Sequence, residues 1–196
     1  MSYVEEATEL AERSLLKREG EDDVCVEDFL RLCSVLGNVY RELLPNAVSY
    51  FLLRDLENGI EVVREESEGK FKTTRELVRH QTTIDPGLKG CMKSSRNGTK
   101  SLLWLQRTCR FIVLVMKGLK EGRRVDESCL TAYDSVLRPY HKWTTQGVAS
   151  FALSTSVLWA RTQCASEDRL IESLGSVSST LHSILEEHGA VFDERM

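Results

Sequence analysis

The stretch "SLLWLQRTCRFIVLVMKGL", Ser101 to Leu119, decides the fold that we predict for this chain. It is almost wholly apolar from Cys109 to Met116, and its apolar residues occupy most sides of a helix. A helix at the protein surface keeps a polar face, so a helix that is apolar on most faces is central. We therefore expect other helices to surround this one.

Helical periodicity dominates the rest of the chain, and strand-like alternation is absent. Ser2 with Glu5 makes a capping box before a first helix that Gly20 would close. Apolar residues then recur every three or four positions from Phe29 to the end of a second helix near Pro45. Further helices are predicted from about 47 to 66, over 70–84, over 101–119, from an Asp126 cap to 137, over 141–159 and from Ser166 onward.

These patterns predict one all-α domain, residues 1–196, with about eight helices and no sheet. The chain has 196 residues, of which 41% are hydrophobic, so it is long enough for one sizeable core. Its formal net charge of -4 argues against nucleic acid, whose affinity comes from Lys and Arg neutralising phosphates. Any contact with a membrane must therefore be local.

The cellular setting is predicted from three observations. The opening residues are acidic where a signal peptide needs a basic region, so secretion is not supported. The longest apolar run, Phe111 to Met116, is far shorter than the ~20 residues that span a bilayer. The cysteines lack C-x-x-C spacing, so we expect buried, reduced thiols in the cytosol at positions 25, 33, 91, 109, 129 and 164.

Signatures of catalysis and of metal binding are missing. The chain has no G-x-S-x-G, no P-loop and no H-E-x-x-H, and His182 and His188 are six residues apart, which is the wrong spacing for one helical face. Asn97-Gly98-Thr99 matches a glycosylation sequon, but we interpret it as a turn before a helix. We expect no enzyme, no metal and no cofactor.

Two groups of residues remain as candidates for function. Lys100, Trp104, Arg107 and Phe111 share one stripe of the central helix. Trp104 is either an aromatic residue of the core, along which the Arg107 side chain extends to reach water, or a flat surface that lines a pocket. The second group is "RPYHKW", residues 138–143, whose histidine is either a structural residue or a ligand contact.

These two groups together carry a resemblance. "SLLWLQR", followed by an apolar helix and then "AYDSVLRPYHKW", is similar to the glycolipid transfer protein family, which has L-L-W-L-x-R in one helix and Y-H-x-W about three dozen residues later. The segment "RDLENGI" is in phase with the family's D-x-x-x-N-I. The family's functional residue types occur in the same order in this chain, as Asp55, Trp104, Arg107, His141 and Trp143.

The resemblance implies a fold and a cargo. The fold is a two-layer all-α sandwich without disulfides, which holds the tails of one sphingolipid in an apolar pocket and its headgroup at a surface cleft. Asp55 would accept the amide N–H and headgroup hydroxyls, His141 would donate to the acyl carbonyl, and Trp104 would stack under the first sugar. The remaining residues expected at the headgroup and amide are Asn58, Lys100 and Arg107.

A transfer protein must also touch a membrane transiently. Trp143, with Tyr140 and Lys142 beside it, has the chemistry of an interfacial anchor. The partners expected are therefore a sphingolipid and a membrane surface. Nothing in the sequence demands more than a monomer.

The sequence departs from the family pattern in the headgroup region. Gly59 stands where the sugar-binding members have Asn, and Val62 stands where they have Lys. Relatives specific for ceramide 1-phosphate have Lys at the Gly59 position and Arg at the positions of Lys100 and Trp104. We therefore expect a glycosphingolipid carrier, with three alternatives: a carrier of ceramide 1-phosphate or another phosphosphingolipid, a lipid sensor read by a protein partner, and a helical scaffold whose cavity is filled by side chains.

Overall fold

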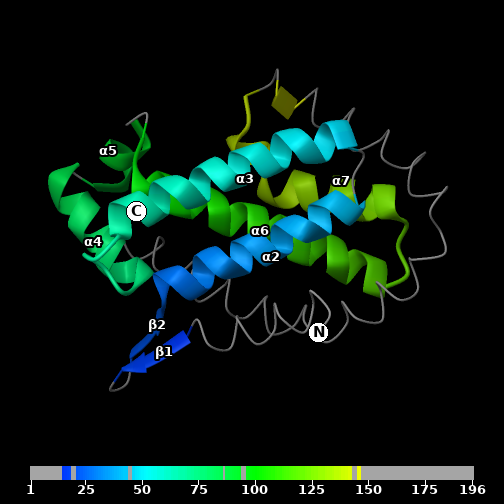
Figure 1. Ribbon diagram of the computed structural model, residues 1–196. Coiled ribbons are helices and arrows are strands. Elements are labelled where there is room, and N and C mark those ends of the chain that lie inside the picture. Colours follow the sequence, from blue (N-terminus) through cyan, green and yellow to red (C-terminus); the bar gives the residue numbers. More distant parts are fainter. Residues whose placement is uncertain are drawn as a thin grey trace.

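The computed structural model describes residues 15–18, 21–43, 46–85, 87–93, 96–142 and 145–146 of the chain (Figure 1). The first 14 residues, most of the predicted seventh helix and the whole of the last lie outside this part. The elements are β1 Leu15–Arg18, β2 Glu21–Val24, α2 Val26–Leu43, α3 Asn46–Ser67, α4 Thr74–Ile84, α5 Gly87–Lys93, α6 Gly98–Lys120, α7 Val125–Val136 and a short 3₁₀ helix, η1, Arg138–Tyr140.

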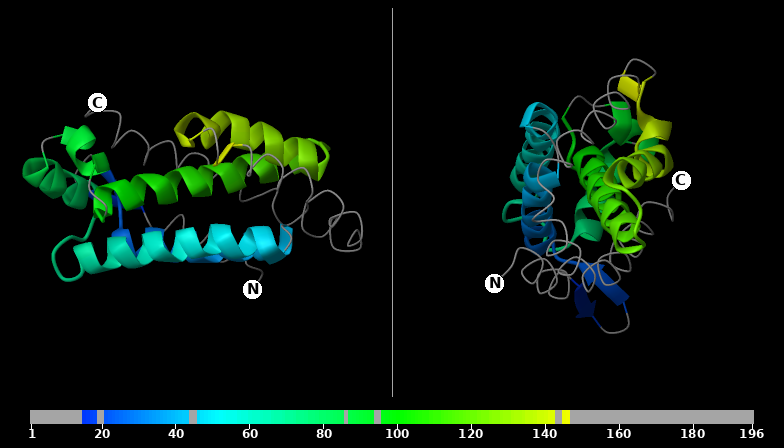
Figure 2. Two further views of the ribbon diagram at one scale, coloured as in Figure 1. Left: turned by 90° about the horizontal axis from the view of Figure 1, so that it is seen from above. Right: turned by 90° about the vertical axis from the view of Figure 1, so that its right-hand side faces the viewer.

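The helices form two layers. Helices α2 and α3 pack against each other as one layer, and α6 and α7 form the other, with α3 in contact with α6 (Figure 2). Helices α4 and α5 lie at one end of the molecule (Figure 1). The predicted all-α, two-layer class is confirmed.

Helix α6 is the centre of the described structure. It contacts every other α-helix of the described part, and 14 of its 23 residues are buried. Leu102, Leu105, Ile112 and Met116 are among the largest fully buried side chains. Burying one such side chain stabilises a protein by about 1.5–3 kcal/mol, so the apolar character of this helix requires the surrounding helices.

Side-chain caps explain where two of the helices begin. Thr73 and Glu76 form a capping box at the start of α4, with the Glu76 amide donating to Thr73 Oγ1 over 3.3 Å. Asn97 caps α6 by accepting from the amide of Lys100 over 3.1 Å. The sequence at residues 97–99 is thus a turn and a helix start, as predicted.

The prediction of a chain without a sheet is wrong for residues 15–24. Strand β1 pairs antiparallel with β2, with Leu15 opposite Val24, where the first helix was expected to run to Gly20. The hairpin leads into contacts with a distant segment, because Cys25 forms a bridge with Thr73 and the Val26 amide donates to the Lys72 carbonyl over 3.0 Å. The predicted cap at Ser2 and Glu5 lies outside the described residues.

Three smaller predictions also need correction. Helix α5 was not predicted, because seven residues are too few to show a helical period. Asp126 does not cap α7: the cap is Arg124, whose guanidinium donates to the Asp126 carboxylate over 2.9 and 3.0 Å. The predicted seventh helix does not include His141, whose backbone is extended, and the Gln146 amide donates to the Lys142 carbonyl at the helix start.

Helices α6 and α7 approach each other closely at Gly118. A Cβ atom there would lie 2.6 Å from Oγ and 2.9 Å from Cβ of Ser128. We expect Gly118→Ala to lower the free energy of unfolding by about 1–3 kcal/mol, the usual cost of overpacking a core, as measured by urea denaturation. The same substitution in a Ser128→Gly background should cost much less. An equal loss of unfolding free energy in the two backgrounds would mean that Ser128 is not the residue that a side chain at 118 overlaps.

Candidate functional site

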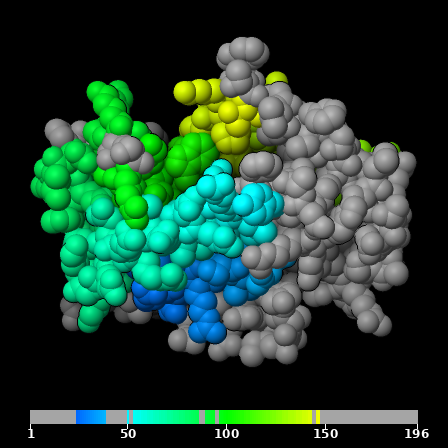
Figure 3. All heavy atoms as spheres, turned by 45° about the horizontal axis from the view of Figure 1, so that its top comes forward, coloured from blue at the N-terminus to red at the C-terminus, as the bar shows by residue number. Residues whose placement is uncertain are grey.

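Three segments that are distant in the sequence meet on one face of the protein. Helix α3 supplies Asp55, helix α6 supplies Trp104 and Arg107, and the segment after α7 supplies Tyr140 and His141. On the face shown in Figure 3, α3, α6 and the segment after α7 are adjacent. We call these five residues the 55–141 cluster.

The His141 ring is held from two sides. It stacks on the Trp104 indole, with ring centroids 5.7 Å apart and planes 23° apart. Its Nδ1 atom shares a hydrogen bond of 3.1 Å with the hydroxyl of Tyr133 on α7. His141 is half-buried, so both contacts are partly shielded from water.

The backbone around His141 is held as well. The side-chain amide of Gln146 donates to the carbonyl oxygens of Arg138 and His141, over 2.9 Å each. Arg138 also pairs with Asp134 of α7 over 3.0 Å. These contacts tie the segment after α7 to that helix and restrict the position of His141.

Arg107 has aromatic rather than carboxylate neighbours. Its guanidinium carbon lies 3.4 Å from the centroid of the Tyr140 ring and 5.5 Å from that of Trp104. Within the described residues no carboxylate pairs with it. Burial lowers the pKa of Arg107 and Tyr140 opposes this effect, but a guanidinium keeps its charge at neutral pH. The site therefore contains a half-buried cation beside two aromatic rings.

Asp55 adds the opposite charge. Asp55 is exposed on α3. Burial lowers the pKa of His141, and the negative charge of the Asp55 carboxylate opposes that shift. The net shift is downward, so His141 is neutral at pH 7. The site thus offers an acceptor-only carboxylate near a neutral imidazole.

The remaining predicted residues lie outside these contacts. Asn58 is exposed on α3, and Lys100 is half-buried one turn before Trp104 on α6. Lys142 is exposed, and Trp143 lies outside the described residues. Phe111, the last member of the predicted stripe, is buried in the core, so the stripe is partly accessible only from Lys100 to Arg107.

Two residues that contact His141 are not predicted from the sequence. Tyr133 and Gln146 lie within the predicted helices that end at 137 and run over 141–159, and no motif marks either of them. Tyr133 is eight residues before His141, and the chain must turn through η1 before the two side chains meet. No local period signals such a contact.

Gly59 has a packing role in this region. A Cβ atom at residue 59 would lie 3.2 Å from Cδ2 of Leu105 on α6. The missing side chain therefore lets α3 approach α6 closely. Asn58, three residues after Asp55, is then the polar residue at the next turn of α3.

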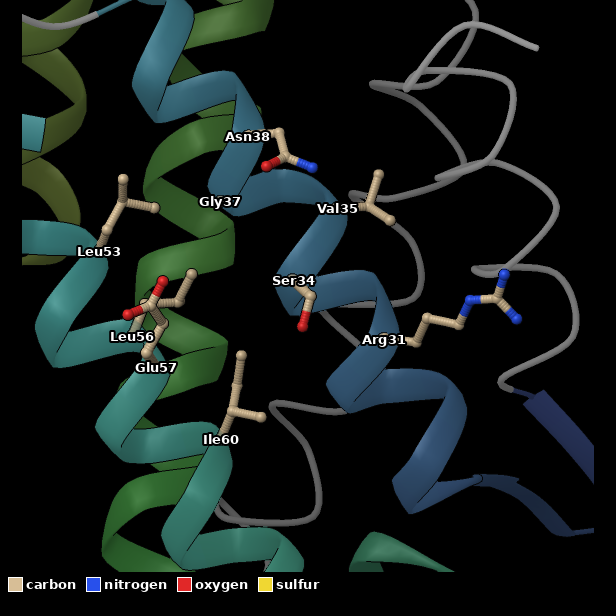
Figure 4. A pocket seen from close by; sticks show the side chains of 9 residues that line it. All are labelled: Arg31, Ser34, Val35, Gly37, Asn38, Leu53, Leu56, Glu57 and Ile60. Carbon is tan, nitrogen blue, oxygen red and sulfur yellow. The ribbon is translucent and has the colours of Figure 1, made fainter.

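A separate groove lies between α2 and α3 (Figure 4). Its volume is about 370 Å³, and none of the 55–141 cluster lines it. Leu53, Leu56 and Ile60 form its apolar side on α3. The groove is thus a feature of the α2–α3 layer and not of the cluster.

Metal ligands, membrane spans and disulfides are absent from the described part of the chain. There, no group of three or more His, Cys, Asp or Glu side chains is arranged to hold a metal ion. None of the described helices combines the length and the apolar character needed to cross a bilayer. The five described cysteines are free thiols, and those of Cys33 and Cys109 lie 3.4 Å apart in the core.

Comparison with solved structures identifies the class of fold. The chain is similar to the GLTP-fold structure of FAPP2, with a TM-score of 0.74, 21% identity, and coverage of 95% of this chain and 92% of that chain. It is also similar to mouse ceramide-1-phosphate transfer protein, with a TM-score of 0.77, 16% identity, and coverage of 97% and 95%. The protein therefore has the GLTP fold.

Sequence comparison identifies the family. The family model of glycolipid transfer protein (GLTP) matches residues 24–158. Glycolipid transfer protein A of Xenopus laevis is 26% identical over 136 residues, which span 62% of this chain and 63% of the frog protein. Glycolipid transfer protein of Danio rerio is 26% identical over 154 residues, or 74% of this chain and 71% of the fish protein. The chain belongs to the glycolipid transfer protein family.

The environment of His141 makes its titration measurable. We expect an NMR titration of its ring protons to give a midpoint below the ordinary value of 6.5, because burial disfavours the imidazolium. As pH falls below 6.5 the unfolded chain binds this proton before the folded chain does, so stability present above pH 6.5 is lost as pH falls through the folded-state pKa. His141→Gln should remove that part of the pH dependence of unfolding. A midpoint at or above 6.5 would contradict this interpretation.

Proposed function

We propose that this protein is a non-catalytic carrier that moves one sphingolipid at a time between membranes. The observation that carries the proposal is the 55–141 cluster, which joins a carboxylate, a neutral imidazole, an indole and a guanidinium on one face of a GLTP-fold protein. These groups can hold a polar headgroup by hydrogen bonds, stacking and charge. The cargo named for the relatives, a glycolipid or ceramide 1-phosphate, is consistent with such a site.

The amide of the sphingolipid is the proposed anchor. A secondary amide presents one N–H donor and one carbonyl acceptor. Asp55, which is acceptor-only, would take the N–H, and His141 would donate to the carbonyl. The nearness of these two charged and polar groups supports this pairing.

The headgroup is proposed to be a sugar. A sugar ring has an apolar C–H face and a rim of hydroxyls, which suits an aromatic plane beside charged groups. Trp104 is half-buried and has Arg107 and His141 as neighbours. Asn58 lies on α3 with Asp55, and Lys100 lies on α6 with Trp104. These two residues would complete the headgroup contacts.

A phosphate headgroup is the second candidate, and one observation favours it. Arg107 is a half-buried guanidinium with no carboxylate partner in the described residues, and guanidinium groups bind phosphate strongly. Lys100, one turn before Trp104, would add a second cation. Ceramide 1-phosphate is therefore the alternative cargo.

Transfer further requires a cavity for the tails and a surface that docks on membranes. Each CH₂ group removed from water is worth ~0.8 kcal/mol, so an apolar pocket offsets most of the cost of carrying two chains through solvent. Tyr140, Lys142 and Trp143 are proposed to dock at the headgroup level of the bilayer. The whole chain would act as one cytoplasmic, monomeric domain without a cofactor, only transiently at membranes.

Asp55 provides the first test. We expect Asp55→Val to slow transfer of a monohexosylceramide between vesicles at least tenfold, because the lipid amide would lose a charged partner worth about 1.5–3 kcal/mol. Asp55 is exposed, so the melting temperature should hold. Glu61→Val changes an exposed carboxylate on the same helix and should leave transfer unchanged. Wild-type transfer by Asp55→Val would remove Asp55 from the site.

The cargo provides the second test. We expect the wild type to move a monohexosylceramide about tenfold faster than ceramide 1-phosphate, a difference of about 1.4 kcal/mol, and Trp104→Ala to abolish glycolipid transfer. The reason is that an aromatic face stacks on a sugar but contributes little to a phosphate. Faster transfer of ceramide 1-phosphate, stopped by Lys100→Ala and not by Trp104→Ala, would favour the second candidate instead.

A further inference from the structure

Tyr133 is a polar side chain in the core that the proposed function does not use. It is 1% exposed and the largest of the fully buried side chains in the described part. Its hydroxyl lies 3.1 Å from Nδ1 of His141, and the two rings are 5.6 Å apart. This buried hydroxyl contacts the one histidine of the cluster, so it affects which ring nitrogen of His141 carries the proton.

We propose that Tyr133 is a positioning residue: it donates its O–H to Nδ1 of His141 and so holds His141 in the tautomer that carries its proton on Nε2. Two arrangements fit the distance of 3.1 Å. In the first, the phenol donates to an unprotonated Nδ1, and both groups are satisfied. In the second, Nδ1–H donates to the phenol oxygen, and the phenol proton needs another acceptor.

The surroundings of Tyr133 favour the first arrangement. Among the described residues it has no other hydrogen-bond partner, so the second arrangement would leave a buried donor unpaired, which is costly. Burial also raises the pKa of Tyr133 and lowers that of His141. At neutral pH the phenol therefore keeps a proton to donate, and the imidazole has a free lone pair to accept it.

This arrangement determines what His141 offers to a ligand. With Nδ1 engaged, Nε2 is the remaining ring nitrogen, and within the described residues it has no hydrogen-bond partner. It carries a hydrogen and can only donate, whereas Asp55 can only accept. The site thus offers one hydrogen-bond donor, the Nε2–H of His141, and one acceptor, the Asp55 carboxylate. A ligand must therefore present an acceptor to His141. This last step rests on the proposed function.

Two rings also restrict the plane of the imidazole. Trp104 stacks on it at 23°, and the Tyr133 hydrogen bond limits its rotation within the stack. Removing only the hydroxyl would keep the packing of the Tyr133 ring and release this restraint. Tyr133→Phe is therefore the informative variant, since it separates the hydrogen bond from the core.

The tautomer is tested on the full chain without lipid. The nitrogen resonances of ¹⁵N-histidine-labelled protein are recorded at pH 7.5, and those of His141, one of four histidines, are assigned by their loss in His141→Gln. We expect an unprotonated Nδ1 and a protonated Nε2 in the wild type, and a larger Nδ1–H fraction in Tyr133→Phe. A protonated Nδ1 in the wild type, or unchanged populations in Tyr133→Phe, would overturn the proposal.

The consequence for binding is tested with a short-chain monohexosylceramide. We expect Tyr133→Phe to weaken binding three- to tenfold, and to have no further effect in a His141→Gln background, because Tyr133 acts through His141. Tyr50→Phe, which removes a hydroxyl from an exposed tyrosine of α3, controls for the substitution. Equal losses in both backgrounds would mean that Tyr133 is only structural. If the wild type does not bind the lipid, the proposed function fails while the nitrogen resonances still report the tautomer.

Discussion

The burial of helix α6 is the constraint on which the rest of the described structure depends. Apolar side chains on most of its faces can leave water only if other helices cover them, and α6 contacts every other described α-helix. The covering by the described helices is incomplete. Trp104 and Arg107 are half-buried, between α3 and the segment after α7. The candidate site thus includes a part of the central helix that these helices leave partly accessible.

The chemistry of the site follows from this partial burial. Lower exposure to water keeps His141 neutral beside the carboxylate of Asp55, and it places the Arg107 guanidinium against the Tyr140 ring. In full solvent these contacts would be weak, because water screens charges and competes for hydrogen bonds. Partial shielding would make the same groups selective, because a ligand that displaces water from a polar group must replace the hydrogen bonds that the water made.

The departure at Gly59 links packing to specificity. Its missing side chain brings α3 close to Leu105 of α6. The same change removes a polar group that the family pattern has next to Asp55. In this protein the cluster therefore takes most of its side chains from α6 and the segment after α7, and α3 supplies the single carboxylate. A headgroup that binds here would be recognised mainly from one side.

Most helices and the central position of α6 could be predicted from the sequence alone. Apolar residues at helical spacing and caps such as Asn97 are local features, and they act in the same way in any fold. The resemblance of short motifs also brought together Asp55, Trp104, Arg107 and His141. The strand pairing of residues 15–18 and the contact between Tyr133 and His141 were found only in the three-dimensional structure. The first depends on hydrogen bonds to residues 21–24 across a turn, and the second on the path of the chain through η1. Neither arrangement is encoded by a helical period within one segment.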